Sequence, residues 1–138
     1  MAVVPKGSSY SDSRYGLVQR YICPTKDDLG TAGTLADIVV AFPKKSLIRK
    51  FGVIANATDI TCSTTTEVEL RTINGTKLAT FVPGSCVIAT GMATGCAPET
   101  ATTVAANAGM IFCVGTDTAD AGTVFYFIDY TQDFEPTV

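Results

Sequence analysis

The sequence predicts an all-β fold, either a single β-sandwich of the jelly-roll-like type or a small barrel. Its 138 residues are the usual size of one domain, and 46% of them are apolar, which is enough to bury a core. Valine, isoleucine and threonine are frequent, and these β-branched residues suit a pleated sheet. Glycine and proline interrupt the apolar runs about every eight to twelve residues, the spacing of short antiparallel strands.

The chain is expected to begin with an extended arm that precedes the β domain. Residues 1–14 (MAVVPKGSSYSDSR) are rich in serine, glycine and proline, so they are expected to be ordered only where they lie on another surface. Residues 15–138 form the predicted β-sandwich domain. Its first strand is predicted at Tyr15–Cys23. The following segment, Pro24–Gly33, contains two adjacent aspartates and two glycines and is predicted to be a turn.

Two further strands are predicted in the first half of the chain. Thr34–Phe42 (TLADIVVAF) contains three consecutive β-branched residues and stops before Pro43, which favours a strand over a short helix. Ser46–Ala55 is predicted to be the next strand. It begins within a basic stretch at the surface and ends in an apolar run.

Thr66–Val82 carries the clearest local signal, a β-hairpin centred on Asn74-Gly75. Asn-Gly favours a two-residue type I′ turn, because both central residues of that turn need a positive φ angle. Folding about this pair predicts two apolar pairs on the buried face and places Glu69 opposite Thr80 on the other face. The apolar pairs are Val68 with Phe81 and Leu70 with Ala79.

Four more strands are predicted in the C-terminal half. Two short ones are expected near Ser85–Ala89 and Thr102–Ala105, and two stronger ones at Met110–Gly115 and Gly122–Tyr130. Because the last strand is almost wholly apolar, both of its faces are expected to be buried. One face would meet the sandwich core and the other a neighbouring subunit. The domain would then hold about seven to nine strands.

The five cysteines are predicted to be buried, reduced and structural. Their number is odd, the chain is long enough to fold without disulfides, and the N-terminal residues do not resemble a signal peptide. Zinc binding is not expected, because no pair shows C-x-x-C spacing and the chain has no histidine. The cysteines are Cys23, Cys62, Cys86, Cys96 and Cys113.

No catalytic, cofactor-binding or metal-binding residues are predicted, and the protein is not expected to be an enzyme. Without histidine, Ser–His and Cys–His nucleophile systems are excluded within one chain. Glu67 and Glu69 share a strand face, but beside an exposed hairpin they are expected to be solvated. Asp117 and Asp120 resemble a calcium loop that lacks the EF-hand spacing and its final glutamate. An enzyme that uses only carboxylates or a cysteine stays open.

The charges are unevenly distributed along the chain. All ten Lys and Arg residues lie within residues 1–77, whereas residues 78–138 carry six carboxylates and no cation. The most basic stretch is either a solvated strand end or a contact for an acidic patch on a partner or a sister subunit. Its members are Lys44, Lys45, Arg49 and Lys50.

Neither nucleic acid nor a membrane is expected as a partner. A formal net charge of −3 opposes a general phosphate-binding surface. The uncharged segment Leu78–Pro98 is too often interrupted by glycine, proline and threonine to form a membrane-spanning helix.

The C-terminal third resembles a known group of structural proteins. A short apolar segment from Val104 leads to Ala108-Gly109, a strand follows, a polar loop ends in Gly122, and a final strand closes with Asp129-Tyr130. This order resembles the closing hairpin of small β-sandwich or jelly-roll proteins of tailed bacteriophages. In size, the chain is most similar to their capsid decoration (cement) proteins.

The resemblance implies a structural role in the virion. It implies a homotrimer on the capsid exterior, assembled in the host cytoplasm, that locks subunits of the major capsid protein together. The arm at residues 1–14 would act as a tether. The five cysteines depart from this pattern, because the finished particle leaves the cell. The alternatives are a head-fibre base, a tail or baseplate component, and a small β-sandwich module that binds a ligand or glycan.

Overall fold

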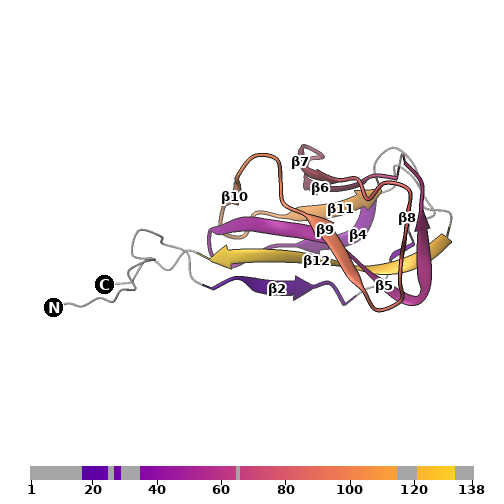
Figure 1. Cartoon of the computed structure of the whole chain (residues 1–138). Helices are drawn as coiled ribbons and strands as arrows, with labels where there is room; N and C mark the ends of the chain where they lie inside the picture. The colour runs from indigo at the N-terminus through magenta and orange to yellow at the C-terminus, as the bar shows by residue number, and fades with distance from the viewer. Residues whose placement is uncertain (1–16, 25–26, 29–34, 65, 115–120, 133–138) are drawn as a thin grey trace, which may run out of the picture.

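The all-β fold is confirmed. The structure, a computed structural model, describes residues 17–24, 27–28, 35–64, 66–114 and 121–132. These residues form strands, turns and loops but no helix, and the strands build two sheets packed face to face (Figure 1). The predicted arm at residues 1–14 lies outside the described residues.

Eleven strands are described, more than the sequence predicts. They are β2 (Gln19–Ile22), β3 (Asp27–Asp28), β4 (Leu35–Val40), β5 (Ser46–Cys62), β6 (Val68–Thr72), β7 (Lys77–Phe81), β8 (Cys86–Ile88), β9 (Ala93–Cys96), β10 (Thr102–Val104), β11 (Met110–Val114) and β12 (Ala121–Gln132).

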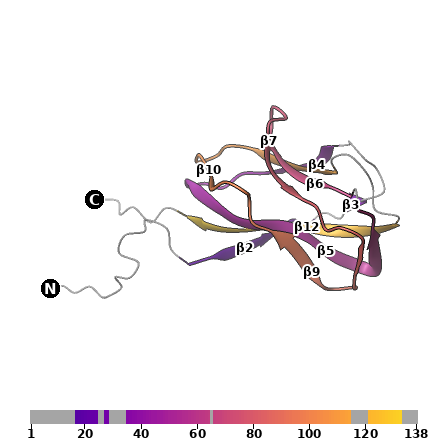
Figure 2. The same cartoon turned by 45° about the horizontal axis from the view of Figure 1, so that its top comes forward.

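The strands are divided between a seven-stranded and a four-stranded sheet. The larger sheet has the order β10-β5-β12-β2, with β3 added to β12 and with β8 and β9 added to β5. The smaller sheet has the order β4-β11-β6-β7. Both views place β6 and β7 of the smaller sheet above β2 and β12 of the larger one (Figures 1 and 2). The arrangement is a small β-sandwich whose larger sheet is curled.

The core lies between the two sheets and is made by alternate residues of the central strands. Phe51 and Val53 of β5 and Tyr126 of β12 are fully buried, as are Leu70 and Phe112 of the smaller sheet. The rings of Phe112 and Tyr126 stack across the interface, with 4.5 Å between centroids and 3° between planes. This stacked pair joins β11 to β12 through side chains.

β5 is longer than the predicted strand Ser46–Ala55 because it continues through a bend. Asn56 pairs with Thr123 of β12, but the next residue of β5 to pair with that strand is Thr61, opposite Ala121. Within this irregular stretch, Ala57 has a φ angle of 55°. Before the bend the other neighbour of β5 is β9, and beyond it β8 takes that place, where Figure 1 shows the magenta arrow of β5 turning upwards. The bend curls the larger sheet.

The predicted hairpin register is confirmed, but its turn differs from the predicted one. Thr72 donates its backbone N–H to Thr76 O at 2.8 Å and accepts from the Gly75 N–H at 2.8 Å, which makes a three-residue loop. Gly75 has a φ angle of 94°, whereas Asn74 does not have a positive φ. A bulge further along the ladder restores the predicted pairing. The pairs are Val68 with Phe81, Glu69 with Thr80, and Leu70 with Ala79.

Two short strands were not expected from the sequence. Asp27–Asp28, predicted to lie in a turn, pairs with Thr123 and Val124 of β12. β9 (Ala93–Cys96) lies along β5 with Gly95 opposite Gly52. A Cβ atom on Gly95 would lie only 2.2 Å from the Phe51 carbonyl oxygen. The two backbones therefore approach closely at this glycine pair, which explains why a segment of small residues forms a strand.

The predicted closing hairpin is wrong, because β11 and β12 belong to different sheets. β11 pairs with β4 and β6, and β12 pairs with β2, β3 and β5. The prediction that β12 is buried on both faces is confirmed for its central part. Phe127, on the face away from the core, is fully buried, and the Arg20 guanidinium lies 4.2 Å above its ring centroid. The chain itself therefore covers Phe127, without a neighbouring subunit.

Candidate functional site

The four predicted contact residues lie around the start of β5. Lys44 and Lys45 are exposed in the turn that precedes the strand. The buried Ser46 hydroxyl donates a hydrogen bond to the Lys44 carbonyl oxygen at 2.9 Å, which fixes the shape of this turn. The two ammonium groups therefore extend from an ordered backbone rather than from a loose loop.

A β-bulge places Arg49 at the surface. Lys50 pairs with Asp129 of β12, but the next pair along the ladder is Ile48 with Tyr130, so Arg49 is the extra residue. Its side chain is exposed, whereas Lys50 is half-buried. Bulges commonly redirect a side chain, and here the guanidinium is turned out beside the sheet.

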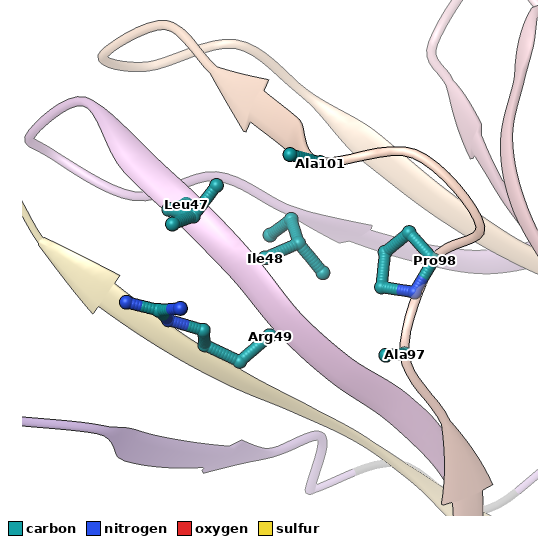
Figure 3. Close-up of a pocket in the computed structure, with 6 residues that line it drawn as sticks. All are labelled: Leu47, Ile48, Arg49, Ala97, Pro98 and Ala101. Atoms are coloured by element: carbon teal, nitrogen blue, oxygen red, sulfur yellow. The ribbon is translucent and has the colours of Figure 1, made fainter.

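A shallow groove of about 260 Å³ lies beside this bulge. One wall is the start of β5 with Leu47, Ile48 and Arg49, and the other is the loop between β9 and β10. In Figure 3, Ile48 faces Pro98 across the groove, and Arg49 runs towards β12, away from Pro98. The lining residues of the loop are Ala97, Pro98 and Ala101. The groove thus has an apolar floor and one cationic edge.

The start of β5 with its four cations, here called the basic end, keeps an excess of positive charge after the ion pairs among the described residues are counted. Arg20 of β2 forms two hydrogen bonds with Asp129, at 2.7 and 2.9 Å, and the bond raises the pKa of Arg20. The negative charge of Asp129 is therefore balanced by Arg20 rather than by Lys50, the residue opposite Asp129 on β5. Within the described part of the chain, Lys44, Lys45, Arg49 and Lys50 form no ion pair. Glu99 is exposed on the groove loop and offsets one of these charges.

The sequence predicts the cations of this site but not the groove. The four cations come from one contiguous stretch, so their grouping is visible in the chain. Ala97, Pro98 and Ala101 are small residues about fifty positions further on, and no residue pattern predicts that their loop lies against β5. Arg20 is also missed, because its pairing with Asp129 depends on β2 lying beside β12.

Other candidate chemistry finds little support in the described residues. No group of three or more His, Cys, Asp or Glu side chains in that part of the chain could hold a metal ion. The calcium-like loop with Asp117 and Asp120 lies outside the described residues. Asn56 begins an Asn-Ala-Thr triplet, which has the pattern of a glycosylation site, and its side chain donates a hydrogen bond to the Thr123 hydroxyl at 3.3 Å, so the side chain has a structural role.

The prediction that Glu67 and Glu69 are solvated is wrong for Glu69. The Glu69 side chain is 1% exposed and pairs with Arg71 on its own strand and with Lys77 of β7, 3.2 Å away. Lys77 also lies 3.7 Å from Glu67, which is less buried. The sequence alone does not predict that Glu69 is buried, because side chains on the outer face of a hairpin are usually solvated.

The two carboxyl groups differ in their affinity for a proton. Burial alone would raise the pKa of Glu69, but hydrogen bonds with Glu67, Arg71 and Lys77 outweigh it and lower that pKa. The hydrogen bond with Glu69 raises the pKa of Glu67, and burial adds to the rise. As the pH falls, Glu67 therefore takes up a proton before Glu69 does.

Glu69→Gln is expected to lower the free energy of unfolding by about 2 kcal/mol at neutral pH, because a buried charge pair is broken but both cations still reach solvent. The lowered folded pKa means that this contribution is present above the unfolded pKa of about 4.3 and is lost as the pH falls through the folded value. Urea unfolding at neutral pH and at about pH 3 measures the loss and its disappearance.

Glu67→Gln is the matched control for Glu69→Gln. The raised folded pKa of Glu67 means that its contribution is favourable below the unfolded pKa and is lost as the pH rises through the folded value. Removing its charge should therefore leave stability at neutral pH unchanged or higher. Equal losses for the two variants at neutral pH would contradict the distinct roles of the two carboxyl groups.

The cysteine prediction is partly corrected. Cys23, Cys62, Cys86 and Cys96 are thiols in the structure. Cys23 and Cys62 are buried as predicted, and burial raises the pKa of Cys23 to about 11, which makes its thiol unreactive. Cys96 is half-buried and donates to the Thr80 carbonyl oxygen at 3.3 Å. Cys86 is exposed, contrary to the prediction.

Comparison with models of known protein families, with curated proteins and with solved structures finds no match to this chain. The described residues contain no helix that is long and apolar enough to cross a bilayer.

Proposed function

We propose that this protein is a non-catalytic structural protein of a tailed-bacteriophage virion, a decoration (cement) protein on the capsid exterior. It binds the major capsid protein through the basic end of β5 and associates with itself as a homotrimer. It needs no cofactor, and it binds neither nucleic acid nor membrane. The β-sandwich architecture and the size of the chain support this proposal.

The observation that carries the proposal is a group of cations at the start of β5 that form no ion pair with the described residues, in a net acidic protein. Lys44, Lys45 and Arg49 are exposed at and just before the start of β5, whereas the chain as a whole has a formal charge of −3. Asp59, by contrast, lies beyond the bend of β5, where it accepts hydrogen bonds from Thr90. A domain with this polarity binds an acidic surface in one orientation, which suits a protein that occupies repeated positions on a shell.

Self-association is supported by the edge of the larger sheet. β2 is the outermost described strand of that sheet, and Ile22 on it is 48% exposed. Leu17 and Val18, which precede β2, are 82% and 60% exposed. An apolar edge strand of this kind invites pairing with another chain, so a homotrimer contact here would protect it. The covered outer face of β12 makes β2 the better candidate for the contact.

The proposal is tested by neutralising the basic end and measuring attachment to shells assembled from the major capsid protein of the same phage. A variant with Lys44, Lys45, Arg49 and Lys50 all changed to glutamine should lose most co-sedimentation while remaining a trimer in light scattering. A second variant exchanges lysine for arginine and arginine for lysine at these positions and should keep attachment. Attachment of the native protein should weaken with salt, because exposed charges are screened beyond about 8 Å at 0.15 M.

Two outcomes would overturn parts of the proposal. A monodisperse monomer at micromolar concentration that binds no shell at any salt concentration would exclude the decoration role. It would favour the second candidate, a small ligand-binding module, which the groove beside Arg49 supports. A trimer that binds other virion parts but not the shell would indicate the head-fibre, tail or baseplate alternative.

A further inference from the structure

Two cysteines lie directly opposite each other on neighbouring strands. Cys62 is the last residue of β5 and Cys86 the first of β8, and these antiparallel strands pair Cys62 with Cys86. The next pairs along this ladder are Thr61 with Val87 and Ile60 with Ile88. Ile60 and Ile88 are both buried in the core, so Cys62 and Cys86 lie on the same face of the sheet as that pair.

This position brings the two cysteines within the range of a disulfide. Opposite residues of an antiparallel pair have Cα atoms about 4.5 or 5.5 Å apart, and disulfides span Cα distances of about 4.4 to 6.8 Å. The Cys86 thiol is turned towards the Pro83 carbonyl oxygen, with Sγ 3.6 Å from it. Rotation of the Cys86 side chain, which is exposed, can therefore direct its sulfur towards Cys62 without moving either backbone.

We propose that Cys62 and Cys86 form a reversible disulfide when the protein meets an oxidising thiol–disulfide pool. The difference in exposure sets the order of events. Cys62 is 3% exposed, so a small disulfide such as oxidised glutathione reaches Cys86 and not Cys62. Cys62 then acts as the resolving thiol. Strand pairing holds it beside the modified Cys86.

The chemistry balances in two exchange steps. The Cys86 thiolate attacks one sulfur of oxidised glutathione, forms a mixed disulfide and releases one glutathione thiolate. The Cys62 thiolate then attacks Cys86 Sγ, forms the protein disulfide and releases the second glutathione thiolate. The two protein thiols give up two electrons and two protons, and one oxidised glutathione becomes two reduced molecules.

The link would fix the curled end of the larger sheet. It would close a loop that contains the whole β6–β7 hairpin, and it would hold the three-residue strand β8 on β5. Cross-links of this loop length stabilise chiefly by restricting the unfolded chain. The oxidised protein should therefore melt at a temperature about 10 °C higher than the reduced protein.

The experiment treats the reduced protein with oxidised glutathione, blocks the remaining thiols by alkylation, and measures intact mass and disulfide-linked peptides. Of the five thiols, three should remain, with a Cys62–Cys86 peptide and no retained glutathione. Cys62→Ala should keep one glutathione on Cys86, and Cys86→Ser should gain neither link nor adduct. Cys96→Ala is the matched control, because Cys96 lies opposite Phe51, and it should form the link as the native protein does.

Three results would overturn the proposal. The native protein could retain glutathione on Cys86 as Cys62→Ala does, which would mean that Cys62 does not resolve the adduct. Cys86 could instead link two chains, which non-reducing electrophoresis would reveal as a covalent dimer. All five thiols could remain after prolonged oxidation. The rise in melting temperature, reversed by dithiothreitol and missing in Cys86→Ser, is an independent readout of the same link.

Discussion

Replacing Gly95 by alanine is expected to lower the free energy of unfolding by about 4 kcal/mol, because the new methyl group would overlap backbone atoms. An added Cβ would lie 2.2 Å from the Phe51 carbonyl oxygen and 2.9 Å from the Cα of Gly52. Neither atom can rotate away as a side chain could, so β9 must separate from β5. Gly52→Ala should cost a similar amount, since its Cβ would lie 2.1 Å from the Thr94 carbonyl oxygen.

The matched control is Gly109→Ala. There the nearest atoms to an added Cβ are side-chain carbons, Val39 Cγ1 at 3.3 Å and Ile73 Cδ1 at 3.4 Å, and both belong to exposed residues that can shift. Gly109→Ala should lower the free energy of unfolding by no more than about 1 kcal/mol. Urea unfolding followed by circular dichroism measures all three variants. A Gly95→Ala loss no larger than that of Gly109→Ala would contradict the close approach of β9 and β5.

Phe112→Ala is expected to lower the free energy of unfolding by about 4 kcal/mol, through lost burial, a cavity and a lost aromatic contact. Phe112 is fully buried, and its ring stacks on that of Tyr126, 4.5 Å away on the other sheet. The substitution therefore weakens the contact between the sheets without breaking a strand pair. The loss should appear in urea unfolding as a lower midpoint with an unchanged slope.

Val39→Ala provides the comparison on the neighbouring strand. Val39 pairs with Ile111 of β11, but its side chain is 54% exposed. Its truncation should change stability by less than about 1 kcal/mol. Similar losses for Phe112→Ala and Val39→Ala would mean that the stacked rings contribute little to holding the sheets together.

Local signals predicted the parts of the fold that short stretches of sequence determine. The β6–β7 hairpin is the clearest example, because alternation fixes which residues face the core. Val68 and Leu70 are buried as expected, and their pairing with Phe81 and Ala79 is confirmed. The turn type was wrong, because Asn-Gly also fits a three-residue loop in which only the glycine needs a positive φ angle.

The features that were missed depend on contacts between distant segments. β9 (Ala93–Cys96) has little strand propensity of its own and forms where Gly95 meets Gly52. Glu69 lies on β6 between β7 and β11, and the β11 partner is more than forty residues away in the sequence. The assignment of β11 and β12 to separate sheets depends on their partners, because a polar loop between two apolar strands fits either a hairpin or a crossing between sheets.

In the candidate site, too, local sequence predicts some features, and others depend on contacts between distant segments. Lys44, Lys45, Arg49 and Lys50 were visible as a run of charge, and the structure places them around one strand start. The bulge at Arg49 and the opposing loop could not be predicted, because both follow from the register between β5 and β12 and from the path of the chain after β9.

The position of β12 in the larger sheet also governs how the chain can fold. β12 lies between β5 and β2, and among the described strands β2 pairs only with β12, which is not complete until residues 121–132 have been synthesised. The pairing of β2 with β12 must therefore follow synthesis of residues 121–132, whereas β5 can pair with β8, β9 and β10 earlier. Pairings between such distant segments place folding on a timescale of about milliseconds to seconds, far slower than local hairpin closure.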